Sequence, residues 1–144
     1  MARIYDLIKD QDTYRADVQQ TVFELARAMV DRNIGAVPVL QDGELVGIFS
    51  ERDLMRKVVG ESRDPHTTLV VEVMTEDPLT VAPDEDVETC MVLMRRHGFR
   101  HLPICEGKIL KGMVSLRDIM LHDLSDKEHD IRMMRAYIQA GPEL

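Results

Sequence analysis

The chain has 144 residues, of which 44% are hydrophobic and 31% charged, as in a globular protein rather than a disordered or fibrous one. Its 18 basic and 26 acidic residues give a net charge of −8, which argues against non-specific nucleic-acid binding because that needs a positive face. The N-terminal residues carry charges throughout and no later stretch is apolar enough to span a bilayer, so we expect a cytoplasmic protein without a membrane partner.

The first predicted elements lie within residues 14–55. We expect a short strand near residues 14–16 and an amphipathic helix whose apolar stripe runs from Val22 to Val30. Asn33 suits the left-handed conformation that ends a helix, and the Asp42-Gly43 step between two apolar runs predicts a β-hairpin. A second helix is expected to begin at Ser50.

The same order of elements recurs 65 positions further along the chain, because residues 77–120 align with residues 12–55 without a gap. A strand is expected near residues 79–81, a helix opened by Pro83-Asp84 and ended by Gly98, a hairpin at Gly107 and a last helix from Ser115. Two copies are too few for a stacked solenoid, so each copy is expected to close its open face against the other.

A proline lies within the first hairpin strand of each copy. Pro38 and Pro103 have no backbone N–H to donate, so we expect each of them at the start of a strand or on an edge strand.

Beyond the repeat, residues 125–138 predict one more helix. Ser125-Asp126-Lys127-Glu128 has the spacing of a capping box, and Ile131, Met134 and Ile138 form an apolar stripe. We expect this stripe to pack in a homodimer, and the alternative is a docking helix for another protein.

The most specific feature of the sequence is the repeated strand-to-helix corner. Residues 47–53 read GIFSERD and residues 112–118 read GMVSLRD, with glycine, serine, arginine and aspartate in register. The simplest interpretation is a capping box, in which serine and aspartate satisfy backbone N–H groups. However, a helix N-terminus also suits an anion, an arginine recurs where capping needs no cation, and a carboxylate can accept hydrogen bonds from both ribose hydroxyls. These corners therefore also allow a sugar-phosphate ligand.

These motifs resemble a tandem pair of CBS domains (named after cystathionine beta-synthase), also called a Bateman module. The segments NIGAVPVLQDGELVGIFSERDLMRKVV and VEVMTEDPLTVAPDEDVETCMVLMRRHGFRHLPI are similar to stand-alone bacterial members of the family. The resemblance implies an α+β fold of two β-α-β-β-α units, related by a pseudo-twofold axis and packed through small three-stranded sheets. We place CBS unit 1 at residues 8–60, a linker at 61–72, CBS unit 2 at 73–122 and a C-terminal capping or dimerisation helix at 123–144.

The resemblance also implies that clefts between the units bind an adenosyl ligand. AMP, ADP or ATP is expected first, and NAD or S-adenosylmethionine is a further possibility; no catalytic cofactor is expected. The first cleft is predicted to contain Ile48, Ser50, Arg52, Asp53, Met74, Thr75, Leu79, Thr80, Phe99, Arg100 and His101. The second is predicted to contain Met113, Ser115, Arg117, Asp118, Tyr14, Arg15, Ile34, Gly35 and Ala36.

The two clefts are not expected to be equal. Residues 95–101 form a basic run in an acidic protein, and Arg100 and His101 lie beyond the predicted helix end, where the helix dipole no longer accounts for them. We therefore expect the cleft of Asp53 and Arg100 to bind more tightly and to depend more on phosphate.

Other reactive residues have simpler interpretations. His97 and His101 have the i, i+4 spacing of a metal pair, but Gly98 interrupts the helix between them, and Cys90 and Cys105 lack metal-ligand spacing. No metal site and no catalytic constellation is predicted, so the protein is not expected to be an enzyme. The hypothesis is a nucleotide-binding regulatory or sensor module that signals to an unidentified effector protein; the alternative is a structural dimerisation module without a physiological ligand.

Overall fold

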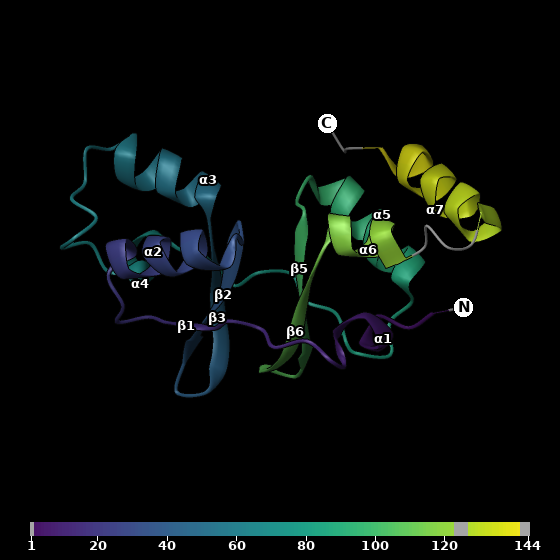
Figure 1. Cartoon of the computed structure of the whole chain (residues 1–144), viewed down its shortest axis with the longest axis horizontal. Helices are drawn as coiled ribbons and strands as arrows, with labels where there is room; N and C mark the ends of the chain where they lie inside the picture. The colour runs from purple at the N-terminus through teal and green to yellow at the C-terminus, as the bar shows by residue number, and fades with distance from the viewer. Residues whose placement is uncertain (1, 123–126, 142–144) are drawn as a thin grey trace. The chain divides into compact units, whose positions relative to one another are not determined.

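The computed structural model describes residues 2–122 and 127–141 and has the predicted α+β composition. The chain forms two compact units, a continuous unit of residues 14–78 and a discontinuous unit of residues 1–13 and 79–144. In Figure 1 the purple N-terminal segment with α1 accordingly lies beside the green strand β6. The boundaries at residues 60/61 and 72/73 stay predictions.

The continuous unit follows the predicted order of elements. It contains β1 (Ala16–Asp17), α2 (Val22–Arg32), β2 (Ala36–Gln41), β3 (Glu44–Ser50), α3 (Glu51–Asp53), the π-helix η1 (Leu54–Val59), α4 (Val70–Val73) and β4 (Thr75–Glu76). The sheet has the order β1-β2-β3-β4, with β1 parallel to β2 and the other pairs antiparallel. It has four strands instead of the expected three, because Thr75–Glu76 pairs with Ile48 and Gly47.

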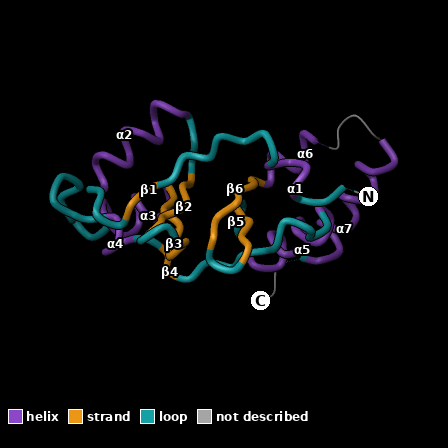
Figure 2. Tube along the Cα trace, turned by 90° about the horizontal axis from the view of Figure 1, so that it is seen from below, coloured by secondary structure: helices purple, strands orange, loops and turns teal. Residues whose placement is uncertain are grey.

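The discontinuous unit repeats this plan with a smaller sheet. It contains α1 (Tyr5–Ile8), α5 (Val87–His97), β5 (His101–Glu106), β6 (Ile109–Ser115), α6 (Leu116–His122) and α7 (Lys127–Ala140). Figure 2 shows in orange the strands of both units; here β5 and β6 form a two-stranded antiparallel sheet. The strand expected near residues 79–81 is reduced to one parallel bridge between Val81 and Ile104.

Each unit has its own hydrophobic core. The core of the continuous unit surrounds Phe49, which has no exposed surface, and includes Val22, Leu25 and Met29 of α2. Val30 was expected on the same stripe but is 72% exposed, so that assignment is wrong. The buried stripe of α2 is therefore narrower than the set of apolar residues that the helix contains.

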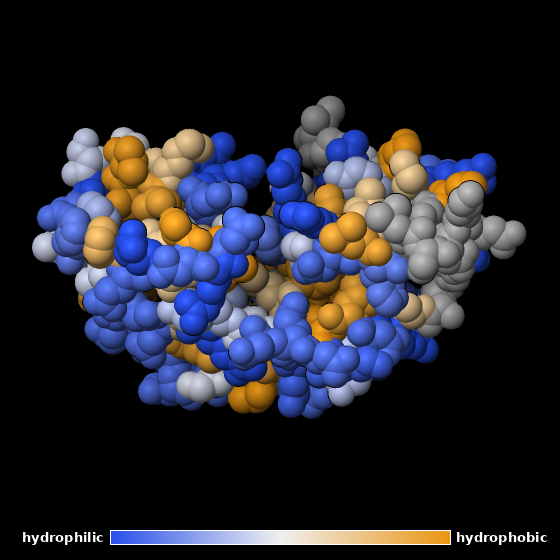
Figure 3. Space-filling view, viewed as in Figure 1, coloured by the Kyte–Doolittle hydropathy of each residue, from blue (hydrophilic) through white to orange (hydrophobic). Residues whose placement is uncertain are grey.

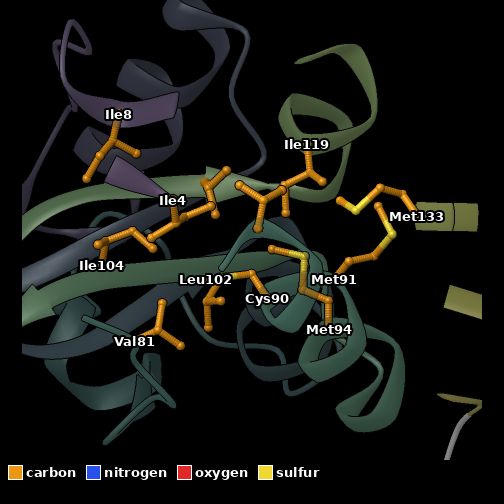
Figure 4. Close-up of a cluster of buried hydrophobic side chains, with 12 residues drawn as sticks. Ile4, Ile8, Val81, Cys90, Met91, Met94, Leu102, Ile104, Ile119 and Met133 are labelled. Atoms are coloured by element: carbon orange, nitrogen blue, oxygen red, sulfur yellow. The ribbon is translucent and has the colours of Figure 1, made fainter. Parts of the chain in front are cut away.

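The second core joins elements from both ends of the chain (Figure 4). Ile4 and Ile8 from the N-terminal segment are buried together with Met91 of α5, Leu102 of β5 and Met133 of α7. The first residues of the chain are therefore part of the folded core of the discontinuous unit.

The turns and helix ends agree closely with the sequence. Asn33 and Gly98 end α2 and α5 in the left-handed conformation, with φ of 53° and 73°. Asp42 and Gly43 both have positive φ (51° and 81°), the combination required by a tight two-residue hairpin turn, and Gly107 takes φ 61° in the second hairpin.

The start of α5 differs from the prediction. The helix begins at Val87 after the N-cap Asp86, not at Pro83-Asp84. Instead, the carbonyls of Pro83 and Glu85 accept hydrogen bonds from the amides of Tyr5 (3.0 Å) and Ile4 (2.8 Å), and the segment forms a turn in which the Glu85 amide donates to the Ala82 carbonyl (3.1 Å).

The two prolines differ in their place in the sheet. Pro103 lies on β5, a strand of the two-stranded sheet and therefore an edge strand, as expected. Pro38 is the third residue of β2, which has neighbours on both sides, so the expectation of a strand start or edge is wrong there. It is tolerated because β1 pairs only with Val39 and Leu40, which leaves the β1 side of Pro38 without a partner strand.

The C-terminal helix α7 packs on α5 by a face other than the predicted stripe. Met133 is buried and the Arg95 guanidinium lies 5.0 Å from the centre of the Tyr137 ring, whereas Ile131, Met134 and Ile138 are more than half exposed. The predicted capping box at residues 125–128 lies outside the described residues.

On the face shown in Figure 3, hydrophilic residues predominate and the hydrophobic ones form separate patches. Within the part of the chain that the structure describes, every helix is too short or too polar to cross a membrane.

Candidate functional site

The strand-to-helix corner at Ser50 forms the predicted capping box. The amide of Ser50 donates to Asp53 Oδ2 (2.9 Å), and the amide of Asp53 donates to Ser50 Oγ (3.2 Å). The Ser50 hydroxyl also lies 3.1 Å from Asp53 Oδ2. The carboxylate therefore has a fixed orientation at the end of β3.

The second corner has the same geometry. The amide of Ser115 donates to Asp118 Oδ2 (2.9 Å), and the amide of Asp118 donates to Ser115 Oγ (3.0 Å). Both copies of the repeated motif are thus helix caps, and in both copies one carboxylate oxygen is held by the backbone. The question for function is what the other carboxylate oxygen does.

The two corners differ sharply at that other oxygen. Asp53 Oδ1 lies 3.0 Å from the ammonium of Lys57 and accepts a hydrogen bond from the Thr75 hydroxyl (3.1 Å), and the residue is only 5% exposed. Asp118, by contrast, is exposed, and among the described residues it forms hydrogen bonds with Ser115 alone. One carboxylate is closed by its own unit and the other is open to solvent.

The backbone of the corners offers little to an anion. The amides of Glu51 and Leu116, the first helical residues, already donate to the carbonyls of Gly35 (3.0 Å) and Arg100 (2.8 Å). The amides of the third helical residues are held by the capping serines. In addition, α3 spans three residues before the chain becomes π-helical, as the hydrogen bond from the Gly60 amide to the Met55 carbonyl (2.8 Å) shows. Side-chain cations, rather than a helix dipole, are the available partners for phosphate.

The glycine at the start of the first motif is explained by close packing. A Cβ on Gly47 would lie 2.6 Å from Met74 Sδ and 2.9 Å from the Thr75 carbonyl oxygen, because β4 and the residue before it pack closely against β3 at this point. The close packing of β4 against β3 places the Thr75 hydroxyl beside the Asp53 carboxylate. The sequence predicted Met74 and Thr75 in one nucleotide site with Asp53; the structure places the Thr75 hydroxyl beside Asp53, and the nucleotide site stays a prediction.

Gly112 likewise allows close packing in the second motif, but the segment that packs against it is a different one. A Cβ there would lie 2.9 Å from Ile8 Cβ and 3.0 Å from Gln11 Oε1. The Gln11 carboxamide donates to the Met113 carbonyl (2.9 Å) and accepts from the Met113 amide (3.1 Å). In the continuous unit the equivalent residue, Ile48, is instead paired with Thr75 of β4.

The remaining predicted site residues are divided between the two units. The continuous unit contains Ile48, Ser50, Arg52, Asp53, Met74 and Thr75 of the first predicted cleft, with Tyr14, Arg15, Ile34, Gly35 and Ala36 of the second. The discontinuous unit contains Leu79, Thr80, Phe99, Arg100 and His101 of the first, with Met113, Ser115, Arg117 and Asp118 of the second. Each Ser–Asp corner is complete within one unit; the assembly of each cleft from both units stays a prediction.

Several predicted site residues already have contacts within their own unit. The ring of Tyr14 carries the Arg32 guanidinium 4.2 Å from its centre, and Phe99 stacks on His97 at 5.7 Å between ring centres. Arg100 is exposed, and its backbone carbonyl accepts a hydrogen bond from the Leu116 amide. Arg100 therefore contacts the corner through its backbone and not through its side chain.

Two residues at the corners, Lys57 and Gln11, are not among the predicted site residues. Lys57 lies four positions after Asp53, a spacing that brings side chains together on a helix and that could have identified it. Gln11 gives no such signal, because its partner Met113 is distant in the sequence and Gln11 precedes the repeated segment.

The two cysteines are both buried. Burial, together with the nearby carboxylates of Glu85 and Asp86, raises the pKa of the Cys90 thiol to about 12, and burial also raises the pKa of Cys105. Both are therefore protonated at neutral pH and unreactive.

Comparison with known proteins identifies the family. The CBS domain matches residues 8–60 and 70–125, two copies that together cover most of the chain. The chain is a CBS-domain protein. The two corners are thus the repeated corners of a tandem CBS pair, and CBS domains are generally regulatory modules rather than catalytic ones.

Relatives of this CBS-domain protein occur in bacteria and plants. It is 36% identical over 129 residues to YlbB, an uncharacterized protein of Bacillus subtilis, covering 88% of this chain and 86% of YlbB. It is 35% identical over 126 residues to the mitochondrial CBS domain-containing protein CBSX3 of Arabidopsis thaliana, covering 84% of this chain but 61% of that protein. The chain therefore spans less than two thirds of the plant relative.

Solved structures share the fold. A putative signal-transduction protein with CBS domains from Burkholderia ambifaria superposes with a TM-score of 0.81 at 30% identity, covering 88% of this chain and 96% of that one. A hexameric CBS-CP12 protein from bloom-forming cyanobacteria has a TM-score of 0.76 at 26% identity, covering 90% and 74% of the two chains.

Proposed function

We propose that this CBS-domain protein is a regulatory module that binds an adenine nucleotide (AMP, ADP, ATP or NAD) and passes the ligand state to a partner protein. The observation that carries the proposal is the Asp118 corner. Its carboxylate is oriented by the Ser115 amide through one oxygen, while the residue is exposed to solvent. A preoriented, open carboxylate is suited to accept two hydrogen bonds from the neighbouring hydroxyls of a ribose.

The open corner changes the expected order of affinity. The sequence favoured the Asp53 cleft as the tighter one because of the basic run at residues 95–101. The closed state of Asp53 favours Asp118 instead, because a ligand at Asp53 must first displace the protein's own contacts. We therefore propose that a first nucleotide binds at Asp118, with Arg117 as the neighbouring cation of the same motif.

The test is calorimetric titration with AMP and ATP of the wild-type chain and the Asp118→Asn variant. Asparagine keeps an oxygen for the Ser115 amide, so the cap survives, but it loses the charge that strengthens ribose binding. Because a hydrogen bond to a charged group contributes about 1.5–3 kcal/mol, we expect affinity to fall at least about tenfold. Glu106→Gln, an exposed hairpin residue, is the control with the same change in charge.

Two results would contradict the proposal. One is an equal affinity in Asp118→Asn, Glu106→Gln and the wild type. The other is a melting temperature that does not change with millimolar AMP, ATP, NAD or S-adenosylmethionine, because a ligand that binds the folded state must raise stability. Native mass spectrometry of the purified protein would identify a ligand that copurifies.

A second candidate function is a structural dimerisation module. The observation that favours it is that Ser50 and Ser115 form complete capping boxes, so the repeated motif already has a structural task. Under this hypothesis the exposed stripe of Ile131, Met134 and Ile138 on α7 is the contact of a homodimer. Light scattering of Met134→Glu would show monomers if this face dimerises, and nucleotides would leave the melting temperature unchanged.

A further inference from the structure

The Asp53 corner holds a complete set of contacts made by one unit. Asp53 Oδ2 is held by Ser50, and Asp53 Oδ1 is held by the Lys57 ammonium and the Thr75 hydroxyl, at 3.0 and 3.1 Å. Lys57 Nζ also lies 3.5 Å from Thr75 Oγ1, so the three side chains form one cluster. The carboxylate is buried, but the Lys57 side chain is 42% exposed and has a flexible stem with room to move.

We propose that Lys57 makes the Asp53 corner selective for phosphorylated nucleosides over the bare nucleoside. The inference rests on the proposed function and adds a specificity-determining residue to it. In the free protein the Lys57 ammonium and the Thr75 hydroxyl occupy the Asp53 oxygen that the ribose hydroxyls need. A ligand binds there only when Lys57 turns away.

The selectivity follows from what the displaced groups need. A ribose replaces both lost hydrogen bonds of Asp53, because its two hydroxyls donate to the freed oxygen. A ribose has no anion for the displaced Lys57 ammonium. The ammonium would therefore exchange its charge-assisted contact with Asp53 for contacts with water. A phosphate on the same ligand supplies a new anion, so a nucleotide replaces both sides of the broken ion pair and a nucleoside replaces only one.

The Asp118 corner has no equivalent ion pair within the described residues. The position equivalent to Lys57 in the second copy is His122, which is exposed, and the described residues include no ion pair between His122 and Asp118. The Asp118 corner accepts a ribose without losing any internal contact. The two corners of one chain therefore differ in what they demand from the ligand.

The experiment isolates the Asp53 corner in full-length protein that carries Asp118→Asn, with AMP and adenosine as the probes. In this background we compare Lys57, Lys57→Met and, as the control, Arg56→Met. Arg56 is the neighbouring exposed cation, so the control has the same change in charge and the same new side chain without touching Asp53. Circular dichroism confirms that each variant is folded.

We expect AMP to bind more tightly than adenosine in the Lys57 protein, and Lys57→Met to reduce this preference at least about tenfold by improving adenosine and weakening AMP. Arg56→Met should keep the preference within about twofold. A preference that is unchanged by Lys57→Met would overturn the inference, and so would a lack of binding by both probes after the lysine is removed.

The result is separable from that of the proposed function. If the wild-type chain binds AMP but Lys57→Met does not alter the preference, the inference fails and the proposed function stands. If wild-type protein binds no adenosyl compound, the proposed function fails; the inference then still requires that Lys57→Met gain adenosine binding, and its failure to do so refutes it as well.

Discussion

Replacing Gln11 by methionine should destabilise the discontinuous unit, although residue 11 lies about a hundred positions from the strand that it supports. The variant keeps the length of the side chain but removes both hydrogen bonds to the Met113 backbone, at 2.9 and 3.1 Å. Each ordinary hydrogen bond contributes a net of about 1 kcal/mol. Because Gln11 is exposed and water replaces part of the loss, we expect the free energy of unfolding to fall by about 1–2 kcal/mol.

The measurement is urea unfolding combined with hydrogen exchange. For a chain of this size the melting temperature should fall by about 3–6 °C. The Met113 amide should exchange faster in the variant, whereas the Phe49 amide in the continuous unit should not change. Gln19→Met is the control, because Gln19 is an exposed glutamine whose side chain makes no hydrogen bond within the described residues. Equal stability of the two variants, with unchanged protection of Met113, would refute the reasoning.

Two further predictions concern the cores of the units. The pKa of Cys90 is raised from 9.0 to about 12, so the folded state keeps this proton longer than the unfolded chain; the resulting stability is present below pH 9 and is lost as pH rises toward 12. Urea titrations should show this decline, with a shallower slope in Cys90→Ala; equal slopes would contradict it. Gly47→Ala should cost about 1–3 kcal/mol, because a new methyl group must push Met74 and the backbone of Thr75 away, and crystallography of the variant would show β4 displaced. An undisplaced β4 with wild-type stability would contradict this second prediction.

The features that the sequence predicted are those set by neighbouring residues. Asn33 and Gly98 end their helices, and Asp42-Gly43 forms its turn, because these backbone conformations are accessible to those residue types whatever surrounds them. The capping box at Ser50 likewise needs only residues three positions apart. The duplicated pattern then predicted the family, and with it the α+β fold.

The errors arose where a distant segment decides the local structure. Pro83-Asp84 resembles a helix start, but the segment forms a turn that accepts hydrogen bonds from the amides of Ile4 and Tyr5. Pro38 lies inside a sheet, where it is tolerated because β1 does not pair with it. In both cases the outcome depends on a segment distant in the sequence, which local preference does not report.

The sequence by itself determined that two equivalent corners exist, each with a serine that caps and an aspartate that it orients. Only the tertiary structure decided which of the two corners is closed, because Thr75 and Lys57 contact Asp53 while Asp118 stays exposed. Capping depends on spacing along the chain, which the repeat preserves. Whether the aspartate is covered depends on what lies beside the strand before the corner. In one unit this is β4, and in the other it is the Gln11 side chain.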